Sequence, residues 1–118
     1  MSAYGQEMIL DLHRCERTEP TEEFFERLCK LIGMEREDLH FWGPAEGGDA
    51  ENELLSGVSA VQFIRTSSVV IHGLDIMGTV YVNLFSCAPF DVFETSIWIK
   101  EWFGAKKMVR TVVVRTMP

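Results

Sequence analysis

Apolar and polar residues alternate along several short stretches of this chain, a pattern typical of β-strands covered on one face. The first stretch spans residues 7–15, where Met8, Leu10 and Leu12 share one face and the other face is mixed. Glycines at both ends of residues 73–78 predict a turn, and the composition of 43–50 predicts a loop. Further strands are expected over residues 35–42, 58–64, 68–71, 79–85 and 107–115.

Two other stretches repeat their apolar residues at helical spacing. The first, 21–32, begins at the end of a turn and N-cap signal over residues 18–21 (TEPT) and ends before Gly33. Its apolar face consists of Phe24, Phe25, Leu28, Leu31 and Ile32. The second begins with a D-x-x-E capping box at Asp91 and ends before Gly104. Its apolar face is expected to consist of Phe93, Ile97, Trp98 and Trp102, with the two tryptophans packing on the sheet.

The order strand, helix, several strands, helix, strand predicts an α+β fold. We expect a two-layer sandwich, in which a mainly antiparallel sheet has two helices packed on one face. The chain has 118 residues, of which 47% are hydrophobic, and this suffices for one core. No internal repeat or linker is visible, so a single domain over residues 1–118 is expected.

The charge of the chain narrows the choice of partners. Its formal net charge of -7 repels phosphate backbones and anionic lipids, so neither nucleic acid nor a membrane surface is expected as a partner. The apolar runs fall short of the roughly 20 residues that a membrane-spanning helix requires. A small cationic molecule suits this charge better.

The three cysteines, Cys15, Cys29 and Cys87, are odd in number, widely spaced and without a CxxC pair. A disulfide framework is therefore not expected, and a reducing cytoplasm is the expected compartment. The start of the chain, MSAYGQEM, is not typical of a signal peptide. No metal site is expected either, because the spacing of His13, Cys15 and His40 supports none.

The candidate chemistry lies in the stretch RTSSVVIHGLDIMGTVYVNLFSCAPFD, which contains Ser67, His72 and Cys87. These residues carry a hydroxyl, an imidazole and a thiol at or near the ends of two predicted strands. Taken singly, each has an ordinary interpretation: a serine in a turn, a histidine bonded to a carbonyl, and a buried cysteine that acts as a small apolar residue.

Taken together, these residues resemble the prokaryotic type of S-adenosylmethionine decarboxylase. The spacing from serine to histidine to cysteine is the spacing of that family. The opening YGQEMILDLHRC is similar to the family's glycine-led first strand, and DVFETSIWIKEWFGAKKMVRTVVV resembles its later helix, turn and final strand. The resemblance covers most of the chain, which is identified as a divergent member.

The resemblance implies a self-processing lyase that serves polyamine (spermidine) biosynthesis. Ser67 aligns with the serine that attacks the preceding carbonyl, here that of Thr66, so that the chain is cut between them and residue 67 becomes a pyruvoyl cofactor. His72 aligns with the histidine implicated in this processing, and Cys87 with the proton donor of the decarboxylation. The family also implies homodimers whose active sites draw on both subunits.

Three stretches, five residues in all, depart from the family pattern. Thr66 replaces a glutamate, Ser68 replaces a histidine, and residues 74–76, Leu-Asp-Ile, stand where the family has Trp-Pro-Glu, which contributes to substrate binding. The expected substrate is therefore S-adenosylmethionine or another cationic amino acid, such as ornithine or arginine. The alternatives are a non-catalytic, uncleaved homologue that acts as a ligand-binding or partner subunit, and an unrelated small α+β protein.

Overall fold

The computed structural model describes residues 3–43, 52, 54 and 56–118. Apart from Gly43, the predicted loop at 43–50 lies outside the described residues. The elements are β1 (Ala3–His13), α1 (Glu22–Leu31), β2 (Arg36–Trp42), β3 (Gly57–Ile64), β4 (Ser67–Leu74), β5 (Thr79–Ser86), α2 (Val92–Phe103) and β6 (Lys107–Thr116). Every predicted strand and helix is present. The predicted turn is shorter than expected, since Gly73 and Leu74 still pair within the sheet.

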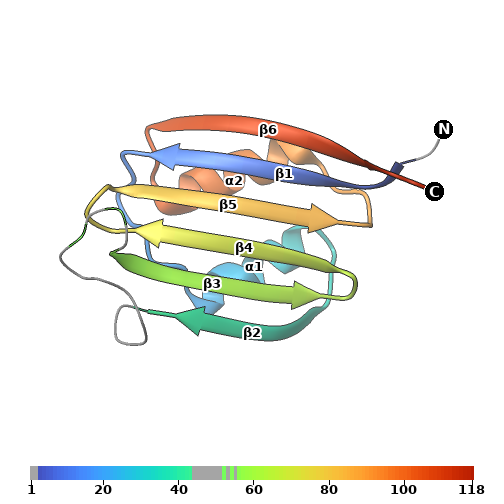
Figure 1. Cartoon of the computed structure of the whole chain (residues 1–118), viewed down its shortest axis with the longest axis horizontal. Helices are drawn as coiled ribbons and strands as arrows, with labels where there is room; N and C mark the ends of the chain where they lie inside the picture. The colour runs from blue at the N-terminus through green and yellow to red at the C-terminus, as the bar shows by residue number, and fades with distance from the viewer. Residues whose placement is uncertain (1–2, 44–51, 53, 55) are drawn as a thin grey trace.

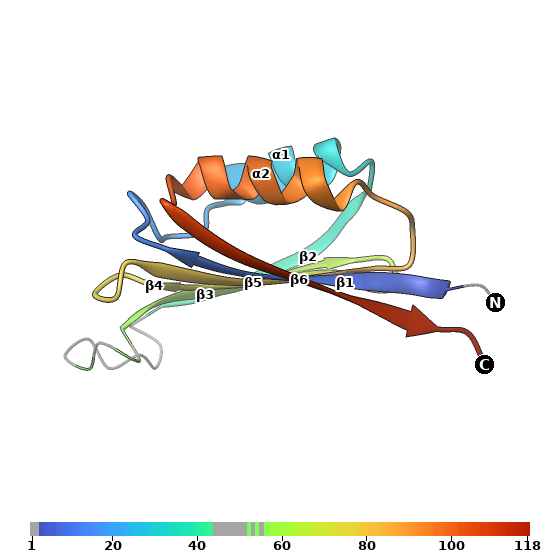
Figure 2. The same cartoon turned by 90° about the horizontal axis from the view of Figure 1, so that it is seen from above.

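The strands form one six-stranded sheet in the order β2-β3-β4-β5-β1-β6 (Figure 1). Each strand runs antiparallel to its neighbours. Both helices lie on the same face of the sheet (Figure 2). This arrangement confirms the predicted α+β two-layer sandwich with two helices on one face.

The core lies between the helices and the sheet, where the apolar residues of both layers meet. Met8, Leu10 and Leu12 of β1 are fully buried there, as their alternation predicts. At the start of α1, the Thr21 hydroxyl accepts a hydrogen bond from the Phe24 N–H at 3.2 Å and so caps the helix. Burial of this many apolar side chains is the main favourable term in folding.

The predicted apolar face of α2 is wrong in part. Its buried residues are Thr95, Ser96, Ile99 and Phe103. Phe93 is 67% exposed, and the guanidinium of Arg110 lies over its ring. Trp98 and Trp102 are partly buried against the core, stack on each other and contact Phe24 of α1, so they also join the two helices.

The two faces of the sheet have different surroundings, and β4 illustrates this. Ser67, Val69 and Ile71 are buried towards the helices, whereas His72 and the other alternate residues point to the opposite face. Within the described part of the chain no helix covers that opposite face, which we call the open face (Figure 2). None of the described helices is long and apolar enough to cross a membrane.

Candidate active site

The turn between β3 and β4 holds the peptide bond of interest. Ile64 pairs with Ser67 across the two strands, which leaves Arg65 and Thr66 as a two-residue turn. Thr66 has a φ of 55°, in the left-handed region that glycine usually occupies. A β-branched residue in this region is strained, and such strain costs about 1–3 kcal/mol. The strained residue directly precedes Ser67.

The segment that follows β5 is held in place by Ser86 and Gly5. The buried Ser86 hydroxyl donates to the carbonyl of Ala88 at 2.6 Å and accepts from the Ala88 N–H at 3.0 Å. β1 passes so close to this segment that a Cβ on Gly5 would overlap the carbonyl oxygen of Ser86. These contacts fix the backbone on both sides of Cys87.

Thr66, Ser67 and Cys87 meet at this end of the sheet. The Cys87 sulfur lies 3.0 Å from the Thr66 hydroxyl oxygen. The Ser67 hydroxyl donates to that sulfur at 3.6 Å and accepts the backbone N–H of Cys87 at 3.1 Å. Ser67 is only 6% exposed. A hydroxyl, a thiol and the Thr66–Ser67 bond are therefore neighbours within one chain.

The surroundings of Cys87 favour its thiolate. Hydrogen bonds from Thr66, and then from Ser67, lower the pKa of the Cys87 thiol below its usual value, and Tyr4 adds a smaller effect. Burial has the opposite effect on Cys15 and Cys29, where it raises the pKa of each thiol. Of the three cysteines, Cys87 is therefore the one whose surroundings favour the thiolate form.

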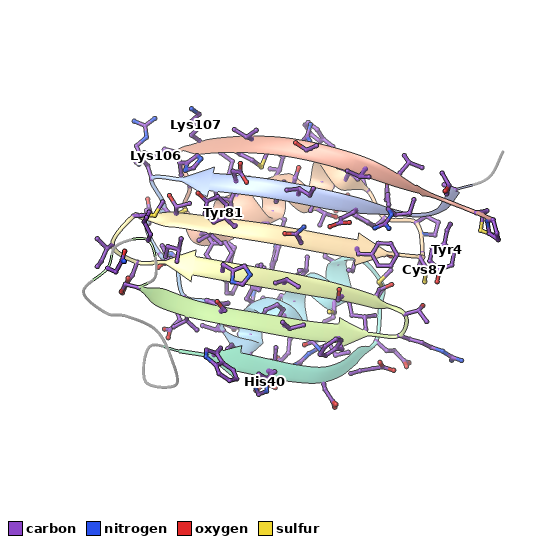
Figure 3. All side chains as sticks on the ribbon, viewed as in Figure 1. Tyr4, His40, Tyr81, Cys87, Lys106 and Lys107 are labelled. Atoms are coloured by element: carbon purple, nitrogen blue, oxygen red, sulfur yellow. The ribbon has the colours of Figure 1, made fainter. Side chains whose placement is uncertain are left out.

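Two surface hollows flank this group, at the end of the sheet where Tyr4 and Cys87 lie (Figure 3). The first, of about 220 Å³, is lined by Ala3, Tyr4, Gly5, Gln6, Cys87, Ala88, Pro89 and Val114. The second, of about 350 Å³, is lined by Glu37, Phe63, Ile64, Thr66, Ser67, Ser68 and Phe85. The first hollow reaches Cys87, and the second reaches Thr66 and Ser67.

His72 does not join this group within the chain. It stands five residues after Ser67 along β4, about 17 Å away at 3.3 Å per residue, and an odd separation puts the two side chains on opposite faces. His72 is exposed on the open face, with its Nδ1 2.7 Å from the hydroxyl of Ser59. Its register partner Tyr81 lies towards the far end of the sheet from Cys87 (Figure 3).

The residues that replace the family's Trp-Pro-Glu lie beyond His72, at the far end of β4. The carboxylate of Asp75 accepts hydrogen bonds from the Ser56 hydroxyl at 2.7 Å and from the Ile76 N–H at 2.8 Å. It therefore stabilises the turn that leads to β5. Elsewhere in the described ranges, histidine, cysteine and carboxylate side chains do not gather into a group of three that could hold a metal ion.

Three residues that position the site were missed in the sequence: Tyr4, Gly5 and Ser86. They meet because β1 pairs with β5, with Gln6 opposite Ser86. A single sequence does not reveal which strands pair. Two signals were available: Gly5 lies in the opening that is similar to the family's glycine-led first strand, and Ser86 stands next to Cys87.

Comparison with known proteins identifies the family and the fold. The sequence model of the family described as S-adenosylmethionine decarboxylase matches residues 6–116. The crystal structure of the adenosylmethionine decarboxylase from Aquifex aeolicus VF5 is similar in fold, with a TM-score of 0.74 and 15% sequence identity over 100% of this chain and 95% of that chain. Among curated protein sequences there is no significant match. The chain belongs to the S-adenosylmethionine decarboxylase family.

Proposed function

We propose that this protein is a pyruvoyl-dependent decarboxylase that cuts its own chain between Thr66 and Ser67. The observation that carries the proposal is the contact of the Ser67 hydroxyl with the Cys87 sulfur at 3.6 Å, next to a strained Thr66. Membership of the decarboxylase family supports it. The three free thiols suit a reducing cytoplasm, where we expect the enzyme to act.

The cleavage needs only the chain and water. The Ser67 oxygen attacks the Thr66 carbonyl carbon through a five-membered ring, and the amide becomes an ester. Loss of the Ser67 Cα proton then expels the Thr66 carboxylate. Water replaces the nitrogen of residue 67, which leaves as ammonia. The products are a chain 1–66 with a new carboxylate and a chain 67–118 that begins with a pyruvoyl group.

The residues around Ser67 fit such a group, because Ser67 is nearly buried and both flanking hollows reach it or its neighbour Cys87. When formed, the pyruvoyl group withdraws the electron pair that carbon dioxide leaves behind as it departs from a bound amino acid. The Cys87 thiol stands beside that position and is the proposed proton donor to the product. Ser67, Thr66 and Cys87 thus form one end of the proposed site.

His72 would serve the site of a second copy of the chain. A homodimer with its open faces in contact would bury the large apolar residues exposed there, namely Trp42, Phe63, Val109 and Val113. A two-fold axis between the sheets and across the strands would bring the His72 end of one β4 over the Ser67 end of the other. His72 of the second copy could then exchange protons in the elimination step.

The proposed substrate is a small cationic amino acid. The net charge of -7 favours a cation, and Glu37 is among the residues that line the second hollow. S-adenosylmethionine, a precursor for polyamine and spermidine synthesis, is the first candidate. Ornithine and arginine follow, because residues 74–76 lack the aromatic and acidic side chains of the family pattern.

The intact mass of the purified protein tests the proposal. We expect two fragments, 1–66 and 67–118, the second with a pyruvoyl end. Ser67→Ala should give a single uncut chain. Release of carbon dioxide from a panel of cationic amino acids then identifies the substrate.

A wild-type chain that stays full-length after prolonged incubation would contradict the proposal. The alternative would then hold, in which the uncleaved chain acts as a ligand-binding or partner subunit. Under that alternative, Ser67→Ala would leave binding unchanged.

A further inference from the structure

In the uncut chain, Cys87 is hydrogen-bonded to the hydroxyl of Ser67. A residue that acts only as the proton donor of the later decarboxylation does not need this contact. We propose that Cys87 is the base that takes the hydroxyl proton of Ser67 in the cleavage, and that Thr66 is the positioning residue that holds its sulfur for that step. The inference rests on the proposed function in one respect, that the Thr66–Ser67 bond is cut.

The hydrogen bonds of Ser67 are arranged for this transfer. Its oxygen accepts the backbone N–H of Cys87 at 3.1 Å, which fixes the hydroxyl beside the thiol. Its own proton is donated to the Cys87 sulfur at 3.6 Å. His72 lies about 17 Å from Ser67 along the strand and on the opposite face, where it is hydrogen-bonded to Ser59. It is therefore not available to Ser67 within the same chain.

Thr66 can keep the sulfur in place in both of its protonation states. Its hydroxyl lies 3.0 Å from the Cys87 sulfur and donates to the carbonyl of Arg65 at 2.7 Å. When Cys87 is a thiol, the S–H can donate to the Thr66 oxygen. When Cys87 is a thiolate, the Thr66 hydroxyl can turn and donate to the sulfur. This contact gives a reason for a threonine where the backbone favours glycine.

The step balances without any other reactant. The Ser67 proton moves to the thiolate as the Ser67 oxygen bonds to the Thr66 carbonyl carbon. The bond between that carbon and the Ser67 nitrogen then breaks, and the nitrogen takes the proton back from the thiol. The result is an ester, a free amine and the original thiolate.

The same contacts explain how one sulfur serves two steps. Cutting consumes the Ser67 hydroxyl and turns Thr66 into a chain end with a carboxylate. The two hydrogen bonds that most lower the pKa of Cys87 are therefore both altered, and the pKa of the thiol moves back towards its ordinary value of 9.0. A base in the uncut chain becomes an acid in the mature enzyme, as its later role requires.

Hydroxylamine, which cuts esters and leaves amide bonds intact, separates this step from the later ones. In the His72→Gln chain we expect the ester to accumulate, so hydroxylamine should release fragment 1–66. In Cys87→Ala we expect ester formation to slow by about 100-fold or more, the usual contribution of a general base. Thermal unfolding of both variants checks that they are folded.

The role of Thr66 has a pH readout. Thr66→Val keeps the β-branched shape without the hydroxyl, and it should move the rise of the cleavage rate to higher pH. Thr66→Ser keeps the hydroxyl and should follow the wild-type curve. The pH dependence of Cys87 alkylation, measured in the uncut Ser67→Ala chain, should shift in the same direction when Thr66→Val is added. If Thr66 contributed to stability alone, neither the cleavage curve nor the alkylation curve would shift.

Two results would overturn the inference, and they differ. If the wild type is cut and Cys87→Ala is cut equally fast, Cys87 is not the base although the proposed function stands. If the wild type is never cut, the proposed function fails and this inference fails with it.

Discussion

The two ends of β4 contain complementary chemistry in opposite settings. At the first end, Ser67 is buried towards the helices and shares its hydrogen bonds with Cys87. At the other end, His72 is exposed on the open face and bonded to Ser59. The first end can bring a nucleophile to a peptide bond, and the second can offer a proton carrier to a neighbour. One chain therefore contains two parts of the proposed site that do not meet.

The difference follows from strand geometry. Side chains alternate between faces, so residues 67 and 72 cannot share a face while the strand is regular. No rotamer change closes a separation of about 17 Å. A second copy is the simplest way to join the two ends, and the predictions below test each end in turn.

The largest expected effect comes from adding a side chain at two glycines that pass close to a neighbouring backbone. A Cβ on Gly5 would overlap the Ser86 carbonyl at the Cys87 end, and a Cβ on Gly73 would overlap the Thr18 carbonyl at the His72 end. Gly5→Ala and Gly73→Ala should each lower the free energy of unfolding by about 1–3 kcal/mol in urea titrations, because the backbones must move apart.

The two variants serve as controls for each other. Only Gly5→Ala should slow the alkylation of Cys87, because only that change moves the segment which holds the sulfur. Equal effects of both variants on Cys87 would mean that the ends are not independent.

The next effect compares two thiols of the same chain. Hydrogen bonds lower the pKa of Cys87, whereas burial raises the pKa of Cys15. The thiolate fraction rises as pH increases through the pKa, so alkylation of Cys87 should begin at a lower pH than that of Cys15. At pH 8, Cys87 should react about 10-fold faster or more. The rates are measured by peptide mapping of the uncut Ser67→Ala chain, which retains the hydrogen bond with Thr66, the larger cause of the lowered pKa. Equal alkylation rates for Cys87 and Cys15 would contradict the difference between the pKa values of the two thiols.

Much of the fold could be predicted from the sequence, because its signals are local. The alternation of Met8, Leu10 and Leu12 predicts β1, and Thr21 marks the start of α1. The face of α2 could not be predicted in the same way. Its burial is decided by tertiary contacts, such as the hydrogen bond from Arg110 to Ser96 at 2.8 Å, which makes a polar residue part of the buried face.

The candidate site was predictable only in part. The resemblance pointed to Thr66, Ser67 and Cys87, and the structure brings these three together. His72 and Ser67 are five residues apart, which places them on opposite faces if both lie in one regular strand. The spacing alone does not show that they do. Tyr4 reaches the site through the pairing of distant strands, which hydrophobic patterns do not specify.

The smallest expected effect is at the His72 end. Ser59→Ala removes the hydroxyl 2.7 Å from the His72 ring. Because this pair is exposed, the free energy of unfolding should change by less than about 1 kcal/mol. The cleavage rate should fall only a few-fold in mass measurements over time, since the imidazole remains but is less well oriented. A loss as complete as that of Ser67→Ala would assign Ser59 a direct role in the chemistry.

Co-expression of two variants tests most directly whether the two parts of the proposed site come together from two copies. His72→Gln retains the cleavage bond, and Ser67→Ala retains the imidazole. Each variant alone should stay uncut, and the mixture should yield fragments 1–66 and 67–118 from the His72→Gln chain only. Cleavage of His72→Gln alone at the wild-type rate, or a mixture that stays intact while the wild type is cut, would contradict the account.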